Sequence, residues 1–432
     1  MFKQFVSLII AATFFLPTFA FAQVDEDFSD EPTVKAPFTK VEPPPLDEPQ
    51  PLDDDEKDAQ PPVNEAEVNE PQPILEAPPV DKPKPIDEPV TEPQPTYEPP
   101  QIEEVEGLEF LVYHQNGVMA FAIIADHEKY QLRPVLAKGQ VRGRATVSQM
   151  NAYDAISTIN ASYFAPSGEI LGNTKIDGLT AGTTYFIRSA IGIRADGTII
   201  FGRQTWRGVL QFNGNEVVVD GVDCERPENG VIVYNSHYGA QTGTNNFGIE
   251  LVVQDGVVVS VVRDAGNSWI PPDGYVVSAH GTAIQNFASV YEGDSISFDE
   301  DFINVEHGAD FNEAIHIIGA GPTLVKDGEI YVTADAEQFP NDIRVGRAPR
   351  SAVGVTQYGD YIFAVVDGRQ AHSKGCTLNE WARILKDNFG AIEAINLDGG
   401  GSSELIFKGK IVNKPSDGHE RAVGDALTIV RR

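Results

Sequence analysis

The sequence contains few cysteines, only Cys224 and Cys376 in 432 residues. A disulfide framework is therefore excluded, because such scaffolds need several cysteine pairs. Two alternatives stay open for these residues, one disulfide or two unpaired buried thiols. Histidines at metal-ligand spacing are also missing, since His280, His307 and His316 stand too far apart in the chain.

Basic residues are scarce as well, with 32 Lys and Arg against 64 Asp and Glu, and the net charge is −32. No basic stripe interrupts this acidic balance, which excludes nucleic acid as a partner. The one long apolar run, from Phe5 to Phe19, is short and is interrupted by Pro17. It does not predict a membrane span, because a spanning helix needs about 20 apolar residues.

The first 22 residues instead have the pattern of a signal peptide. Lys3 precedes the apolar run, and Ala20 and Ala22 occupy the two small positions of a cleavage site. No cysteine follows at once, so a lipoprotein anchor is not expected. We expect an exported protein, periplasmic or secreted.

Residues 23–105 are dominated by Pro, Glu and Asp. They hold 20 of the 30 prolines, and 24 acidic residues against 5 lysines give them a charge of −19. Such a chain cannot bury enough apolar surface to offset its ordering entropy, and its like charges keep it extended. The composition predicts a disordered spacer, with a ligand for a proline-recognising partner as the alternative.

Residues 106–432 are long enough for one large domain, and turn dipeptides divide them into strands. Asn116-Gly117 lies between two apolar runs, which is the strongest short-range signal for a β-hairpin. Asp196-Gly197, Asp255-Gly256 and Asp327-Gly328 predict three further hairpins. The fold class expected is α+β, a strand-rich mixed sheet with few helices.

The clearest helix is predicted to begin after Thr377, where T-L-N-E forms a capping box, and to end before Gly390. An apolar strand from Ile392 to Leu397 follows it. Residues 204–312 carry no motif that can be placed, and we expect them to form an inserted lobe that sets substrate choice.

The stretch A-I-N-L-D-G-G-G-S-S, from Ala394 to Ser403, is the strongest functional signal. An apolar strand carries one carboxylate at its end, and three glycines and two hydroxyls follow. Consecutive glycines let backbone N–H groups turn towards an anion, although such loops are also found as plain turns. No Lys follows the glycines, so this is not a Walker loop. The candidate site residues here are Asp398, Gly399, Gly400, Gly401, Ser402 and Ser403.

A second strand, Y-I-F-A-V-V, also ends in Asp-Gly, followed by an arginine. If the two strands run the same way in one sheet, Asp367 and Asp398 emerge at the same edge. Two carboxylates near arginines suit acid and base chemistry on a sugar, and Arg350 could hold a phosphate through its planar fork. A turn for Asp367 and a surface ion pair for Arg350 are the alternatives. Ser351 and Arg369 belong to the same candidate binding set.

Asn160, at the end of the apolar strand in I-N-A-S-Y-F, could orient a substrate hydroxyl or simply close a turn. His372 and His419 are candidates for proton transfer. Asp367, Asp398 and glycine carbonyls could hold a hard cation such as calcium, but their spacing is not diagnostic. The metal is therefore left unknown, and the sequence requires no cofactor.

Seven motifs resemble those of the phosphodiester glycosidase domain family when taken in order. They are N-A-S-Y-F, G-A-G-P-T-L-V-K-D-G, R-A-P-R-S-A-V-G-V-T, V-V-D-G-R, G-C-T-L-N-E-W-A, N-L-D-G-G-G-S-S and E-R-A-V-G-D-A-L. The resemblance covers residues 106–432 and is most specific in the C-terminal half. Cys376 stands where relatives often have an apolar residue, which suggests packing.

The resemblance implies hydrolysis of the bond between a sugar anomeric carbon and a phosphodiester oxygen, releasing free sugar and a phosphomonoester. The residues themselves suit that chemistry, with Asp398 acting on water or on the anomeric carbon and Asp367 assisting or orienting as the second catalytic carboxylate. With export, the expected substrate is a glycan or sugar phosphate of the cell envelope. Two alternatives stay open. One is a serine hydrolase that uses Ser402 or Ser403, and the other is a non-catalytic protein that binds envelope polysaccharide.

Overall fold

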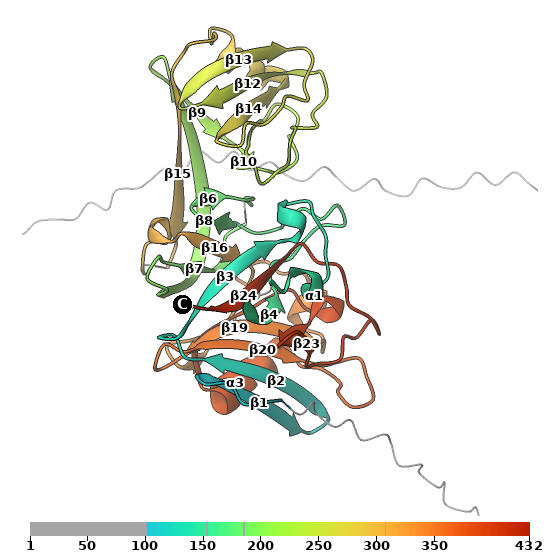
Figure 1. The fold of residues 1–432 in the computed structure, drawn as a ribbon. Coiled ribbons are helices and arrows are strands. Elements are labelled where there is room, and N and C mark those ends of the chain that lie inside the picture. The colour runs from blue at the N-terminus through green and yellow to red at the C-terminus, as the bar shows by residue number, and fades with distance from the viewer. Residues whose placement is uncertain (1–101, 153, 185, 307) are drawn as a thin grey trace, which may run out of the picture. The chain divides into compact units, whose positions relative to one another are not determined.

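The computed structural model describes residues 102–432, except residues 153, 185 and 307 (Figure 1). The chain divides into two compact units, and all described residues belong to the second, Asp87–Arg432. The expected signal peptide at 1–22 and nearly all of the expected spacer at 23–105 lie outside the described residues. No helix within the described part is both long and apolar enough to cross a membrane.

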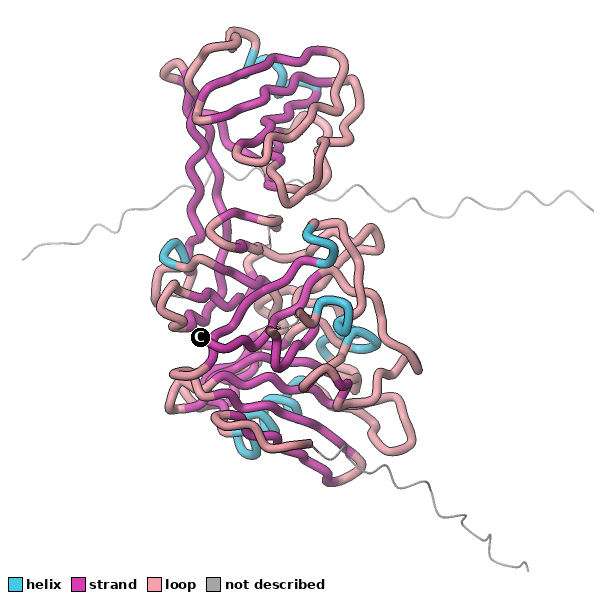
Figure 2. The backbone as a smooth tube through the Cα atoms, viewed as in Figure 1, coloured by secondary structure: helices cyan, strands magenta, loops and turns pink. Residues whose placement is uncertain are grey.

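Strands dominate the described residues, and Figure 2 shows how few segments are helical. The strands form four sheets, here called A to D. In sheet D one pair, β10 (Gly221–Val222) and β11 (Val231–Tyr234), is parallel. The other strand pairs among residues 102–432 are antiparallel. The expected strand-rich mixed α+β class is confirmed.

Sheet A is seven-stranded and carries both predicted Asp-ended strands. Its order is β1 (Leu108–Gln115), β2 (Val118–Ala125), β20 (Tyr361–Val366), β19 (Arg350–Thr356), β21 (Ala391–Asn396), β17 (Thr323–Lys326) and β18 (Glu329–Ile330). Strands β20 and β21 both pair antiparallel with β19, so they run in the same direction. Asp367 and Asp398, which follow these two strands, therefore emerge at the same edge, as the sequence predicted.

Both faces of sheet A are buried along its central strands. The sequences of these strands are therefore continuous apolar runs and do not alternate between apolar and polar residues. In β2, Phe121 and Ile123 pack into the core beneath sheet B, and Ala120 and Ala122 face α3 (Leu378–Phe389). Trp381 of α3 is fully buried in this second core.

Helix α3 begins and ends where the sequence predicted. Thr377 accepts a hydrogen bond from the Glu380 N–H and Glu380 caps Thr377 in return, which completes the capping box. Gly390, at φ 73°, adopts the left-handed conformation that ends the helix. The expected strand follows as β21.

Sheet B brings the ends of three further strands to the edge of sheet A. Its order is β23 (Lys410–Ile411), β22 (Leu405–Phe407), β4 (Ala155–Asn160), β24 (Asp425–Arg431) and β3 (Tyr130–Leu136). Strand β4 ends at Asn160, opposite Ala426 near the start of β24, and Ile159 pairs with Leu405 at the start of β22. The end of β4 and the beginnings of β22 and β24 thus meet.

Sheets C and D are connected by two long strands, β8 (Ile199–Phe212) and β15 (Ile296–Asn304), which Figure 1 shows as a ribbon. The ladder runs from Gln204 opposite Asn304 to Phe212 opposite Ile296. Sheet C also contains β7 (Arg188–Ile193), β16 (His316–Gly319), β5 (Lys175–Ile176), β6 (Leu179–Thr180) and β9 (Asn215–Val219). Sheet D adds β14 (Gly274–His280), β12 (Gly248–Gln254) and β13 (Val257–Arg263) to β10 and β11.

Sheet D has its own hydrophobic cluster, which includes Leu251, Val277 and Phe287. All of its strands lie within the expected lobe at 204–312, and that lobe boundary stays a prediction. The four expected hairpins are confirmed by the pairs β1–β2, β7–β8, β12–β13 and β17–β18. The remaining helices among the described residues are short, namely α1 (Val147–Met150), α2 (Asn341–Arg344) and the 3₁₀ helices η1 (Ala137–Gly139), η2 (Gly281–Phe287), η3 (Phe311–Glu313) and η4 (Gly400–Ser402).

Candidate functional site

The N-A-S-Y-F segment at the end of β4 and the loop after β21 are joined by two hydrogen bonds, one between backbone groups and one from a side chain. The Asp398 N–H donates to the Ala161 carbonyl at 2.9 Å, and Asn160 Nδ2 donates to the Asp398 carbonyl at 2.6 Å. These bonds fix the backbone of Asp398 on both sides. The carboxyl group is therefore held by a rigid sheet edge.

Asp398 is partly exposed, and its carboxyl group has an unusual pKa. The Gly399 N–H donates to its Oδ1 at 2.9 Å, and the side chain of Ser402 also bonds it. Burial raises the pKa of Asp398 to about 6, although those two hydrogen bonds and the charge of Arg421 lower it. A carboxyl group that titrates near neutral pH is suited to proton transfer.

The amide cradle expected of the glycine loop stays a prediction that the hydrogen bonds of this loop do not favour. The Gly399 N–H bonds Asp398, and the Gly400 N–H donates to the Pro349 carbonyl at 2.9 Å. Two of the three amides are thus already bonded inside the protein. The glycines instead make room for arginines, because any side chain at Gly401 would overlap Arg421 and its partner Asp417.

Two guanidinium groups lie against this loop. A side-chain carbon at Gly400 would stand 3.5 Å from Nη1 and Nη2 of Arg369, which is exposed. Arg421 donates from Nε to Asp417 Oδ2 at 2.9 Å, and its Nη1 lies 3.5 Å from Ser402 Oγ. Arg369 was among the expected residues, whereas Arg421 was missed. Its signal was the motif E-R-A-V-G-D-A-L.

Arg350 is buried and bonded to the main chain. Its Nη2 donates to the carbonyls of Ile343 and Gly346 at 3.0 and 2.8 Å, and its Nε donates to the Cys376 carbonyl at 3.3 Å. Only 3% of its surface is exposed, so in this structure the guanidinium supports a loop. The phosphate-binding role expected for Arg350 stays a prediction that these contacts do not favour.

Asn160 and Ser351 form a buried connection under the site. The Ser351 hydroxyl donates to Asn160 Oδ1 at 2.7 Å, and the Glu404 N–H donates to the same oxygen at 3.2 Å. Since Asn160 Nδ2 bonds Asp398, both ends of this amide are used within the protein. Ser402 and Ser403 are each 1% exposed, so their hydroxyls are also inside the structure.

Asp367 is buried and holds a histidine. Its Oδ2 lies 2.9 Å from His372 Nε2, and its Oδ1 accepts from Asn413 Nδ2 at 3.1 Å and from the Lys414 N–H at 2.9 Å. Burial raises the pKa of Asp367, while its bond with His372 opposes the rise. Asn413 also donates to the Ser403 carbonyl at 3.1 Å, which connects the two predicted constellations.

Two carboxyl groups near the site were not expected from the sequence. Asp425, at the start of β24, accepts from the Ser162 N–H and hydroxyl, both at 2.8 Å. Burial raises its pKa to about 6, and the charge of Asp398 adds to the rise. Burial raises the pKa of Glu404 to about 9, with a further contribution from its neighbour Glu420.

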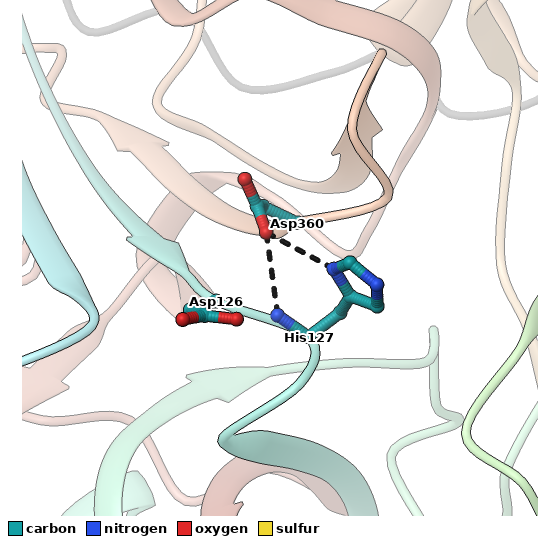
Figure 3. A group of neighbouring side chains, drawn as sticks. All are labelled: Asp126, His127 and Asp360. Carbon is teal, nitrogen blue, oxygen red and sulfur yellow. Dashed lines mark hydrogen bonds and ion pairs between the residues drawn. The ribbon is translucent and has the colours of Figure 1, made fainter.

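One group of side chains in the described part has the composition of a metal site, namely Asp126, His127 and Asp360 (Figure 3). Asp360 Oδ1 accepts from the His127 N–H at 3.3 Å and lies 3.2 Å from its Nδ1. The group stands where Ala125 pairs with Tyr361, at the opposite end of β2 and β20 from Asp367. It is therefore separate from the candidate site, where a cation stays a prediction.

Both cysteines are free thiols, so the unpaired alternative describes this structure. Cys376 is buried against α3, which agrees with the expected packing role, and Cys224 is partly buried. Burial raises the pKa of each thiol to about 12. Neither thiol is therefore an activated nucleophile.

The chain is similar to curated proteins over short segments. An 81-residue segment is 44% identical to the SPbeta prophage-derived protein YomE of Bacillus subtilis (strain 168), and covers 19% of this chain and 12% of that protein. A 116-residue segment is 31% identical to the mouse N-acetylglucosamine-1-phosphodiester alpha-N-acetylglucosaminidase, and covers 24% of this chain and 22% of the enzyme. The chain thus aligns with about a fifth or less of each relative's length.

Two solved structures share the fold over most of the chain. A hypothetical protein from Synechocystis has a TM-score of 0.65 at 23% identity, covering 75% of this chain and 62% of that one. A protein of Burkholderia pseudomallei K96243, described as exported, has a TM-score of 0.61 at 23% identity, covering 72% of this chain and 74% of that one.

A family model described as phosphodiester glycosidase matches residues 247–430. The matched region contains Asp367, the glycine loop and Arg421, together with most strands of sheet D. The resemblance expected from the ordered motifs is therefore confirmed over residues 247–430, where the chain matches the phosphodiester glycosidase family.

Proposed function

We propose that this protein hydrolyses the bond between a sugar anomeric carbon and a phosphodiester oxygen. One observation carries the proposal. The partly exposed carboxyl group of Asp398 lies beside a glycine loop against which Arg369 and Arg421 pack. The mouse relative is an enzyme that acts on an N-acetylglucosamine-1-phosphodiester, and the family match supports the same bond type here.

The chemistry of the leaving group suits these residues. When the C1–O bond breaks, the electron pair stays on the phosphate oxygen, and a phosphomonoester leaves as an anion that needs charge stabilisation more than a proton. Arg369 and Arg421 supply positive charge near the loop. Asp398 takes the proton of the attacking water, or attacks C1 itself, and water provides the hydroxyl of the free sugar.

Asp367 is given a different role from the one first expected. Because its two oxygens bond His372, Asn413 and Lys414, it acts in this proposal as a positioning residue for His372. A buried carboxylate that bonds one ring nitrogen fixes the orientation of the imidazole. The direct catalytic role of Asp367 is replaced in the proposal by this indirect one.

We also propose that the protein acts outside the cytoplasm, on a sugar phosphate of the cell envelope. The signal-peptide pattern of residues 1–22 and the acidic spacer composition of 23–105 support export. One structural neighbour is described as exported, which agrees with this address. A serine hydrolase is disfavoured, because Ser402 and Ser403 are each only 1% exposed.

The experiment measures free sugar released from a panel of sugar-1-phosphodiesters, UDP-N-acetylglucosamine included. We expect wild-type protein to release free sugar and a phosphomonoester, and Asp398→Asn to lose about 10²- to 10⁴-fold in kcat. Asp255→Asn, in the β12–β13 turn, is the matched control and should keep full activity. Binding without turnover by the wild type would instead support the polysaccharide-binding alternative.

A further inference from the structure

Two loops of sheet D lie side by side at one end of the β12–β13 hairpin. Residues 241–247 lead into β12 and residues 265–270 follow β13, so both loops lie at the end away from the Asp255-Gly256 turn. The Thr242 N–H donates to the Ser268 carbonyl at 3.0 Å, and a second backbone bond of 3.0 Å joins Ile270 to Ala240. The two loops therefore hold each other in place.

Trp269 lies between these two backbone bonds, directly opposite Gln241. Such a residue pair is flanked by hydrogen bonds but forms none itself, and in antiparallel strands it brings the two side chains closest together. Both side chains are exposed, the indole by 53%. Neither forms a hydrogen bond or ion pair with another of the described residues. An aromatic ring and a free amide are thus presented to solvent together.

A buried carboxylate fixes the two loops from beneath. Glu250 of β12 is completely buried and accepts from the Ser268 N–H at 2.8 Å. The hydroxyl groups of Thr244 and Ser278 donate to its Oε1 at 2.7 and 2.8 Å. The residues on either side of Trp269, namely Ser268 and Ile270, are also buried. The exposed indole therefore has a rigid backbone, and a ligand that binds it does not have to order the loops.

The side chains of both loops are neutral. Their sequences are Q-T-G-T-N-N-F and A-G-N-S-W-I, and Phe247 is 67% exposed. The whole chain carries a charge of −32, so it repels anionic ligands, and a cationic ligand finds no carboxylate in these two loops. A neutral ligand with both apolar and hydrogen-bonding groups matches this surface.

We propose that residues 241–247 and 265–270 form a binding site for a neutral glycan. One face of a pyranose ring carries only C–H groups and packs on the Trp269 indole, while the hydroxyl or acetamido groups at its edge hydrogen-bond the Gln241 amide. None of these residues belongs to the candidate catalytic site, so the inference goes beyond the proposed function. It gives the protein a means of attachment to a polysaccharide.

The test titrates the full chain with chitohexaose, a neutral hexamer of N-acetylglucosamine, and follows tryptophan fluorescence. Of the three tryptophans, Trp381 is fully buried and Trp206 partly buried, so Trp269 is the most exposed. Stacking of a sugar on its indole should shift the emission to shorter wavelength in a saturable way. Hexagalacturonate, which is equally long but anionic, should bind at least about tenfold more weakly. Absence of both a fluorescence change and a heat of binding with chitohexaose would overturn the inference.

Variants locate the binding site, with calorimetry as the measurement. Trp269→Ala should weaken chitohexaose binding at least about tenfold, because a rigid aromatic anchor contributes much of the affinity of such a surface. Gln241→Ala should weaken it less, since only hydrogen bonds to the sugar are lost. Tyr358→Ala is the matched control, because Tyr358 is 73% exposed but lies in the turn between β19 and β20. Equal affinities of Trp269→Ala and wild type would contradict the assignment.

A second copy of the chain is the other candidate occupant of this surface. We expect Trp269→Ala to leave the oligomeric state unchanged in size-exclusion chromatography, and a dimer that dissociates in this variant would overturn the glycan assignment.

Activity measurements keep this inference separable from the proposed function. Trp269→Ala should hydrolyse a methyl N-acetylglucosamine-1-phosphodiester at the wild-type rate, and Asp398→Asn should bind chitohexaose with wild-type affinity. If no phosphodiester is hydrolysed but chitohexaose binds through Trp269, the proposed function fails and the glycan site stands. If hydrolysis is observed but chitohexaose does not bind, the glycan site fails alone.

Discussion

The carboxyl group of Asp398 is the residue on which the proposed chemistry depends. Its pKa is raised to about 6 by burial, so it is ionised at neutral pH and becomes protonated as the pH falls through 6. A base or nucleophile works only when ionised. We therefore expect kcat to fall about tenfold per pH unit below 6, measured as sugar release between pH 4.5 and 8.

The pH prediction has a control variant and a result that would contradict it. Asp255→Asn should reproduce the wild-type pH profile, because its carboxyl group lies in a turn of sheet D. A wild-type rate that stays flat from pH 8 down to 4.5 would mean that ionised Asp398 is not required.

The raised pKa of Glu404 predicts how the free energy of unfolding depends on pH. Its pKa is raised from 4.5 to about 9 in the folded protein. Below pH 4.5 it is protonated in both the folded and unfolded states, so its full contribution is present there. Between pH 4.5 and 9 the unfolded state ionises while the carboxyl group, 1% exposed in the folded protein, stays protonated, so stability falls over this range and the contribution is lost once the pH passes 9.

Glu404→Gln mimics the protonated form at every pH. We expect its melting temperature to rise relative to wild type as the pH increases from 4.5 towards 9, as measured by thermal unfolding. Glu128→Gln, at an exposed position, should show no such trend. A difference between Glu404→Gln and wild type that does not change with pH would refute the assigned protonation.

At the scale of elements, the glycine loop after β21 leaves space for the side chains of Arg421 and Asp417. A methyl group at Gly401 overlaps Arg421 and Asp417, so Gly401→Ala should displace the guanidinium from Ser402. A displacement of about 1 Å can cost about 100-fold in rate, and we expect a loss of that order in kcat/KM. Gly346→Ala is the control, because there an added carbon makes only ordinary contact, at 3.4 Å. Full activity in Gly401→Ala would disconnect Arg421 from catalysis.

Local sequence signals predicted the elements of sheet A well. Asn116 and Gly117 have φ values of 54° and 68°, the left-handed pair that a two-residue hairpin requires. Helix α3 carries its start and stop signals within its own residues. Such features depend on neighbours in the chain, which is why they can be read without knowledge of the fold.

The site was harder to predict because distant segments build it. Asp425 and Arg421 reach Asp398 only because β24 pairs with β4, a contact between residues more than 260 positions apart. The sequence also could not show that the side chains of Arg350 and Asn160 form their hydrogen bonds with other groups of the protein. Residue type and strand position indicated the right edge of the sheet, but not which side chains face outwards.

At the scale of the whole molecule, two sheets of the described residues build the candidate site. Strands β20 and β21 of sheet A lead to Asp367 and Asp398, and β4 and β24 of sheet B carry Asn160 and Asp425. Sheet D contains none of these strands and has a hydrophobic cluster of its own. In the proposed function, bond cleavage therefore depends on sheets A and B.

The most direct measurement is hydrolysis of an N-acetylglucosamine-1-phosphodiester in water enriched in oxygen-18, with mass analysis of the products. Cleavage at the anomeric carbon predicts free sugar and a phosphomonoester that contains no heavy oxygen. Cleavage at phosphorus would place the label in the phosphate of a released product and would contradict the account.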